Sequence, residues 1–210
     1  NDLNSLINQI RLAGVKISEH KNISSNSEEG KELITKYSIN FAPTIVLSKD
    51  AGAYAIIQQA WPQIGSKESD GSYVLRQVSP PFTNLTTGKL RGMVDIIYLT
   101  DKSCSECYNV SLHRNIIVNP LSFAIRLDKE ETFDASEAKG KELIAKYNIT
   151  QVPTVILSSE VNVYPSNPVL KQFFSVEKDG SYVFRRLSSV GAYKDLQTNQ
   201  IVKAPQQSEQ

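Results

Sequence analysis

Two cysteines, Cys104 and Cys107, are the residues of this chain with the clearest capacity for chemistry, and the chain has no other cysteine. A Cys-x-x-Cys pair can exchange disulfides, form a structural clip or supply half of a zinc site. The apolar run Val94 to Leu99 predicts a strand, and residues 100–103 lead to a helix expected to open near Cys104. A helix start favours a thiolate through its unpaired N–H groups and positive dipole end. The pattern therefore predicts dithiol redox geometry, with Cys104 attacking and Cys107 resolving.

The elements that would position this pair occur in an internal repeat. The helix and strand blocks repeat at an offset of 110 (140 minus 30), and a later turn and strand block repeats at an offset of 109 (179 minus 70). The matching blocks are Gly30–Ile39 with Gly140–Ile149, Pro43–Ser48 with Pro153–Ser158, and Asp70–Arg76 with Asp179–Arg185. The chain is therefore expected to hold two copies of one domain.

The expected domains are residues 1–92 and 93–203, followed by a polar tail at 204–210. Moving the two cysteines back by the repeat offset carries them ahead of Asn1, so the first domain is expected to lack its N-terminal strand and redox motif. We expect a longer parent chain to supply that strand, and whether it supplies a second Cys-x-x-Cys stays open.

Four local expectations concern single elements. Residue patterns predict strands where apolar and polar residues alternate, a short helix before a proline, and a turn-rich join between the two domains. These are strands at Val15–Ser18 and Leu121–Leu127, a helix at Ala53–Ala60 that Pro62 ends, and a join at Thr83–Gly92.

A helix that ends in Tyr147-Asn148-Ile149, followed by Val152-Pro153-Thr154 before an apolar strand, lies downstream of the cysteines. With the Cys-x-x-Cys motif, this arrangement resembles the thioredoxin-like superfamily. The resemblance implies an α/β fold of two tandem domains, each a central mixed sheet flanked by helices. It also implies that Pro153 is cis and lies beside the cysteines, where it keeps metal from the thiols. The backbone of Val152 would bind an extended substrate.

The implied activity is thiol–disulfide exchange on protein disulfides, as in protein disulfide isomerases, with a redox recycling partner and no cofactor or metal. The family usually has Trp before the first cysteine, where this chain has Ser103, and its oxidases commonly place histidine between the cysteines. Here the intervening residues are Ser105 and Glu106. Glu106 opposes the thiolate and Lys102 favours it, so we predict a protein less oxidising than the strong oxidases.

Other interpretations stay open. The cysteines could form a structural clip, in a thioredoxin-like protein that acts only as a binding or scaffold module. His113 could join them in a copper or zinc site.

Charge and composition narrow the remaining classes. With 23 basic and 22 acidic residues the formal net charge is +1, which gives no electrostatic reason to expect a nucleic acid partner or an anionic membrane. No apolar run has the length of a membrane span. Four Asn-x-Ser/Thr sequons, at Asn22, Asn84, Asn109 and Asn148, give a slight lean toward an extracytoplasmic location. The compartment, the substrates and the oligomeric state stay open.

Overall fold

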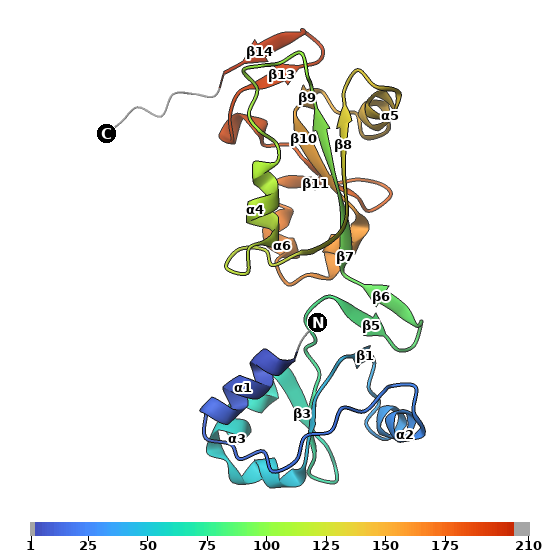
Figure 1. Cartoon of the computed structure of the whole chain (residues 1–210), viewed down its shortest axis with the longest axis vertical. Coiled ribbons are helices and arrows are strands. Elements are labelled where there is room, and N and C mark those ends of the chain that lie inside the picture. Colours follow the sequence, from blue (N-terminus) through green and yellow to red (C-terminus); the bar gives the residue numbers. More distant parts are fainter. Residues whose placement is uncertain (1–2, 204–210) are drawn as a thin grey trace, which may run out of the picture. The chain divides into compact units, whose positions relative to one another are not determined.

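The computed structural model describes residues 3–203 as a mixed α/β protein with several sheets and six helices (Figure 1). The chain divides into two compact units, unit 1 at Asn1–Arg91 and unit 2 at Gly92–Gln210. The expected tail at 204–210 lies outside the described residues. Among residues 3–203, no helix combines the length and the apolar character that crossing a membrane requires.

Unit 1 contains three helices and two small antiparallel sheets. The sheets have the strand orders β2-β4-β3 and β1-β5-β6. The elements in chain order are α1 (Asn4–Leu12), α2 (Glu28–Lys36), β1 (Phe41–Ala42), β2 (Val46–Leu47), a 3-10 helix (Lys49–Ala53), α3 (Ala55–Ile64), β3 (Gly65–Lys67), β4 (Tyr73–Leu75), β5 (Phe82–Asn84) and β6 (Lys89–Arg91).

Strand β4 shows why the core of unit 1 forms. Successive side chains of a strand point to opposite faces. Tyr73 and Leu75 therefore join one apolar cluster with Trp61 of α3, while Val74 joins a second cluster with Tyr37 at the end of α2. The two faces of this strand are thus covered by different helices, and this fixes its register.

Unit 2 is built around a five-stranded mixed sheet with the order β11-β12-β10-β7-β8, in which only β7 and β8 are parallel. A second sheet has the order β14-β13-β9. The elements are β7 (Met93–Thr100), α4 (Leu112–Val118), β8 (Arg126–Asp134), α5 (Ala138–Tyr147), β9 (Gln151–Val152), β10 (Thr154–Leu157), a 3-10 helix (Ser159–Val163), α6 (Asn167–Leu170), β11 (Phe174–Val176), β12 (Tyr182–Phe184), a 3-10 helix (Leu187–Ser189), β13 (Tyr193–Asp195) and β14 (Gln200–Val202).

The large sheet of unit 2 is covered on both faces. Val155 of β10 lies in one apolar cluster with Ile117 of α4 and Leu170 of α6, whereas Ile156 lies in another with Leu143 of α5. Figure 1 accordingly shows α4 and α6 on one side of the sheet and α5 on the other. All four residues of β10 are buried, and successive residues contact opposite layers of helices.

The two units repeat the same polar contacts. In each, a tyrosine hydroxyl donates to the aspartate of an Asp-Gly-Ser turn and shares a second hydrogen bond with the serine hydroxyl of that turn, and an arginine pairs with a glutamate. A cis proline lies between the two short strands that follow the helix. The sets are Tyr37, Asp70, Ser72, Arg76, Glu68 and Pro43 in unit 1, and Tyr147, Asp179, Ser181, Arg185, Glu177 and Pro153 in unit 2. These contacts account for the residue types that the repeat preserves.

The helix after the cysteines begins later than expected. Helix α4 starts at Leu112, and the cysteines lie in the preceding loop. Asp101 accepts a hydrogen bond from the Ser103 backbone N–H, and Asn109 accepts one from the Ser111 backbone N–H. Such side-chain bonds stabilise turns in place of a helix. The prediction of a helix opening near Cys104 was therefore wrong.

Two strand predictions also need correction. The strand expected at Leu121–Leu127 is β8 and begins at Arg126, because Asn119 accepts from the Leu121 N–H and closes a turn that leaves Leu121 96% exposed. Residues 15–18 form no strand. No strand pairs with them among the described residues, so their backbone lacks a ladder.

The remaining two expectations are each correct in part, because a helix lies in the region of Ala53–Ala60 and turn residues lie at 85–88, but the extents differ. Helix α3 continues past Pro62 to Ile64, since burial of Ile57 and Trp61 on one face outweighs the single backbone bond that proline removes. The segment Thr83–Gly92 contains strand residues of the hairpin β5–β6. Its turn residues close that hairpin, because Asn84 accepts from the backbone N–H groups of the two following threonines.

Candidate functional site

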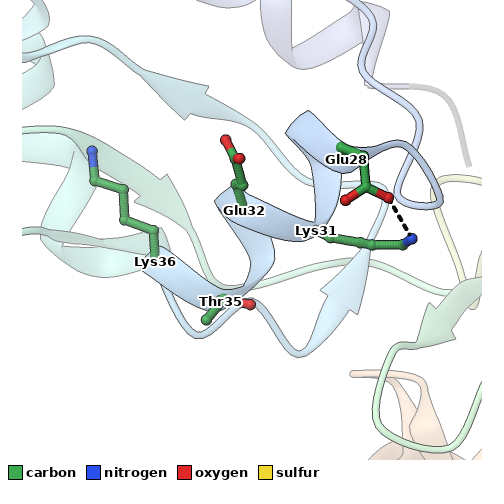
Figure 2. Close-up of a pocket in the computed structure, with 5 residues that line it drawn as sticks. All are labelled: Glu28, Lys31, Glu32, Thr35 and Lys36. Atoms are coloured by element: carbon green, nitrogen blue, oxygen red, sulfur yellow. Dashed lines mark hydrogen bonds and ion pairs between the residues drawn. The ribbon is translucent and has the colours of Figure 1, made fainter.

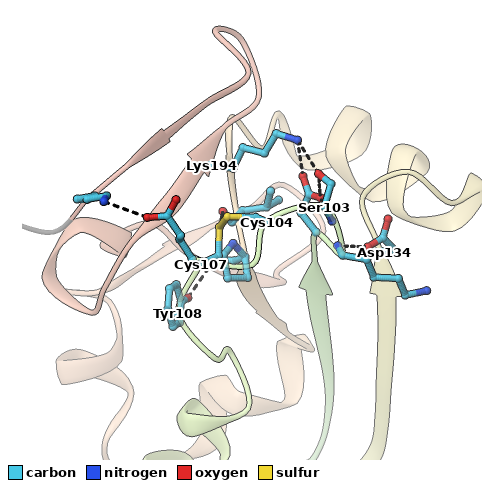
Figure 3. Close-up of a disulfide and its surroundings, with 12 residues drawn as sticks. Ser103, Cys104, Cys107, Tyr108, Asp134 and Lys194 are labelled. Carbon is cyan, nitrogen blue, oxygen red and sulfur yellow. Dashed lines mark hydrogen bonds and ion pairs between the residues drawn. A yellow bond between two sulfur atoms is a disulfide. The ribbon is translucent and has the colours of Figure 1, made fainter.

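The two cysteines form a disulfide on the loop between β7 and α4 (Figure 3). The S–S distance is 2.04 Å and the Cα atoms are 5.4 Å apart. Cys104 is buried, with 8% of its surface exposed, and Cys107 is half-buried. The pair can therefore be reduced to two thiols by two electrons and reoxidised within one short loop.

The local environment alters the roles expected for the two sulfurs. Since α4 begins at Leu112, its positive end is not at Cys104 and the dipole argument for a Cys104 thiolate no longer holds. Burial also disfavours the charged form of a thiol. Cys107 is the more exposed residue, which favours it as the sulfur that a partner meets first.

The structure brings Val152 and Pro153 to the disulfide. Cys107 Sγ lies 3.9 Å from the carbonyl oxygen of Val152, and the Tyr108 hydroxyl donates to the carbonyl oxygen of Pro153 at 3.0 Å. Val152 ends β9 and is fully buried, and Thr154 begins β10. The loop and this strand end are thus in direct contact.

The backbone of Val152 is already paired. Strand β13 lies antiparallel to β9, with Lys194 opposite Val152. Two residues further along, the N–H of Leu196 donates to the carbonyl of Thr150 at 2.8 Å. Because hydrogen-bonded pairs alternate along an antiparallel ladder, the N–H and C=O of Val152 also face Lys194. A substrate chain would need these same groups.

Lys194 also forms an ion pair beside the disulfide. Its Nζ lies 2.9 Å from Asp101 Oδ2. It also donates to Ser103 Oγ at 3.0 Å, and Figure 3 shows Lys194 directed at Ser103. The Lys194 and Asp101 side chains are only 16% and 9% exposed. Burial alone would raise the pKa of Asp101, but hydrogen bonds from Ser103 and Lys194 outweigh it and hold that pKa below its ordinary value.

The side chains expected to tune the thiolate are directed to other partners. Lys102 Nζ pairs with Glu137 at 2.8 Å, which raises the pKa of Lys102, and Glu106 pairs with Lys203 at 3.0 Å. Ser105 is exposed. Both charges are therefore partly neutralised and exposed to solvent, so their effect on the sulfurs is smaller than their sequence positions suggest.

A buried carboxylate fixes the start of the loop. Asp134, at the end of β8, accepts from the backbone N–H of Lys102 at 2.6 Å and from that of Ser136 at 3.0 Å. Burial would raise the pKa of Asp134, but these bonds and the Ser136 hydroxyl lower it overall. The loop is thus anchored to the sheet by a charged acceptor.

His113 lies in a buried contact with the tyrosine that follows Cys107. Its Nε2 is 3.2 Å from the Tyr108 hydroxyl, and its ring packs edge-on against Phe184 at 4.5 Å between centroids. Because Tyr108 donates its only proton to Pro153, the His113 ring N–H is the donor in this pair. Burial lowers the pKa of His113 to about 4 and raises that of Tyr108. His113 is therefore neutral near pH 7.

No metal cluster accompanies the disulfide in the part of the chain that the structure describes. Within residues 3–203, no three His, Cys, Asp or Glu side chains gather as a metal site would require. A hollow of about 410 Å³ lies elsewhere, on α2 in unit 1 (Figure 2). It is lined by Glu28, Lys31, Glu32, Thr35 and Lys36. All five belong to one helix with balanced charges, which is typical of a solvated face.

Sequence reasoning missed Asp101, Tyr108, Asp134 and Lys194. Each acts through a contact with a segment distant in sequence, and no motif marks such contacts. The repeat does mark the position of Lys194. Its hairpin has a counterpart in unit 1, where Thr83 lies opposite Ala42 as Lys194 lies opposite Val152.

No protein-family model, no curated protein and no solved structure matches the chain. Functional assignment therefore depends on the geometry of the cysteine loop.

Proposed function

We propose that this protein is a thiol–disulfide oxidoreductase that acts on protein disulfides through the Cys104 and Cys107 pair. In this proposal both units are thioredoxin-like domains, and the cysteines make unit 2 the redox-active one. The observation that carries it is the 3.9 Å approach of Cys107 Sγ to the Val152 carbonyl, directly before Pro153. A disulfide beside a cis proline that directly precedes a central strand is the arrangement that the resemblance implies.

The proposed reaction is balanced in atoms and electrons. In the oxidising direction a substrate thiol loses its proton to solvent, and its thiolate attacks Cys107 Sγ. A bond forms between the two sulfurs, the Cys104–Cys107 bond breaks, and its electron pair remains on Cys104 as a thiolate. A second substrate thiolate then attacks the substrate sulfur, which releases the substrate disulfide and the Cys107 thiolate. The protein has gained two electrons, which a redox partner protein must remove.

This order exchanges the roles predicted from the sequence, in which Cys104 attacked and Cys107 resolved. The reason is access, because a partner reaches the more exposed Cys107 first and the buried Cys104 is left to resolve the mixed disulfide. In the reducing direction the same steps run backwards, with the Cys107 thiolate attacking a substrate disulfide.

Insulin reduction with Cys104→Ser and Cys107→Ser tests the proposal. Both variants are expected to lose turnover, while Ser105→Ala, which changes the exposed residue between the cysteines, keeps it. Cys104→Ser should accumulate a mixed disulfide through Cys107, and Cys107→Ser should accumulate much less. Turnover that survives in either cysteine variant would refute a dithiol mechanism.

A second candidate is a binding or scaffold module whose disulfide is a structural clip. The burial of Cys104 and the paired backbone of Val152 favour this candidate. It predicts no insulin turnover in the unmodified protein and a disulfide that resists reduction in the folded state.

A further inference from the structure

We propose that the hairpin β13–β14, residues 193–202, is a latch that occupies the edge of β9 where an extended substrate chain would add, with Lys194 holding it closed. This inference depends on the proposed function only for the identity of the incoming chain. The contacts that define the latch do not depend on it.

The first argument is competition for one set of backbone groups. Recognition by strand addition needs a free row of N–H and C=O groups. On β9, Val152 faces Lys194 in a hydrogen-bonded pair, and the carbonyl of Thr150 accepts from the N–H of Leu196. An extended chain can therefore reach the Val152 backbone only when β13 leaves it.

The second argument is that the latch is attached to the cysteine loop itself. The Tyr108 N–H donates to the carbonyl of Ala192 at 2.8 Å, next to Cys107. A Cβ on Gly191 would come within 2.6 Å of the Tyr108 Cβ, so the two backbones approach closely. On the other side of the loop, Lys194 pairs with Asp101. Opening the latch must break contacts on both sides of the disulfide.

A comparison with the hairpin of unit 1 shows which contacts of β13–β14 belong to the fold of both units and which occur only in unit 2. Its hairpin β5–β6 pairs with β1 in the same register, with Thr83 opposite Ala42 just before Pro43. No cysteine lies in that unit. A hairpin at this edge is thus part of the fold in both units, and unit 2 adds its contacts to the cysteine loop, of which the Lys194 ion pair is the one that a side-chain substitution can remove. Lys194→Thr therefore installs a residue that this fold already accepts.

The latch predicts which thiols reach the disulfide. Cys107 is half-buried, so a small thiol can attack it without displacing β13. An extended peptide that also needs the Val152 backbone must wait for the latch to open. The protein is therefore expected to discriminate between substrates by their need for backbone pairing.

The test uses the full oxidised chain mixed with an excess of either 2-mercaptoethanol or a short unstructured peptide with one cysteine. Loss of the disulfide is followed for the unmodified protein, for Lys194→Thr and for the control Lys178→Thr, which removes an exposed lysine on the β11–β12 turn. Losing a charged hydrogen bond should open the latch about tenfold more often. The ratio of the peptide rate to the mercaptoethanol rate should rise about tenfold in Lys194→Thr. It should stay constant in the control.

Taking a ratio cancels any general effect of the lost charge on thiolate attack. An unchanged ratio in Lys194→Thr would overturn the latch proposal. Hydrogen exchange gives a second test: if the amide hydrogens of Val152 and Lys194 exchange in the unmodified protein as fast as in an unfolded chain, the proposal is also overturned. Urea unfolding verifies that the variant is folded. The outcome is separable from the proposed function, because a raised ratio without insulin turnover would support the latch and refute the oxidoreductase.

Discussion

His113 is expected to make unit 2 lose stability as the pH falls from about 6.5 to about 4. Burial lowers the pKa of this imidazole from 6.5 to about 4 in the folded state. Between these values the unfolded chain binds a proton that the folded chain does not bind. Stability therefore decreases as the pH falls through this window, and is fully retained above it. Below about pH 4 both states are protonated and this group causes no further loss.

The size of the effect follows from the two pKa values. At about pH 5 the unfolded imidazole is almost fully protonated and the folded one is mostly neutral, which corresponds to about 2 kcal/mol of lost stability relative to neutral pH. Asp101 and Asp134 have pKa values below their ordinary 3.8, so their effects fall at lower pH. Glu130 and Glu137 also have lowered pKa values, from an ordinary 4.5, so they begin to contribute at the lower end of the window, and the loss at about pH 5 comes mainly from the histidine.

Urea unfolding at about pH 7.5 and about pH 5, followed at the amide resonances of β7 and β10, measures this loss in unit 2. His113→Gln keeps a donor for Tyr108 but does not titrate, so it should lose almost none of its own stability across the window. His20→Gln, at the exposed second histidine, should behave as the unmodified protein does. If the free energy of unfolding of His113→Gln falls by the same amount, about 2 kcal/mol, between the two pH values, the argument from burial is refuted.

Three further changes test the packing of unit 2. Leu170→Ala should lower the free energy of unfolding, measured by urea titration, by about 2–5 kcal/mol because Leu170 is fully buried. The control Val169→Ala, at a residue 46% exposed, should change it by less than about 0.5 kcal/mol. Gly140→Ala should lower the thermal midpoint, since its Cβ would overlap the Asp134 carbonyl oxygen; an unchanged midpoint would contradict that contact. Arg185→Met should cost about 1–3 kcal/mol in urea, because it removes a 3.0 Å ion pair and hydrogen bonds to two carbonyls.

Local signals in the sequence predicted much of the secondary structure. Ser27, a residue type that favours helix starts, caps α2 by accepting a hydrogen bond from the Gly30 N–H at 3.1 Å. The strand from Val94 lies within β7, in which four of the apolar residues, Val94, Ile96, Tyr98 and Leu99, are buried. Both depend on neighbours within a few positions, where periodicity and capping act. The failures near Asp101 and Asn119 also have local causes, but these side chains bond to the backbone in ways that residue type alone does not determine.

The candidate site divides in the same way. The spacing of Cys104 and Cys107 was sufficient to predict that they could pair. Lys194 could not be predicted to lie beside them, because its contact with Asp101 depends on the pairing of β13 with β9. The start of α4 failed as well, and with it the electrostatic reason for choosing Cys104. Contacts that depend on strand order are not encoded in any short segment.

The polar contacts that occur in both units provide an internal reference for experiments. The tyrosine at the end of α2 and the tyrosine at the end of α5 bond to equivalent turns, yet only unit 2 holds a disulfide. A change on reduction that appears at both tyrosines reports the solvent or the reductant, and a change at the second alone reports the cysteine loop. Subtracting one signal from the other would isolate the redox response within a single sample.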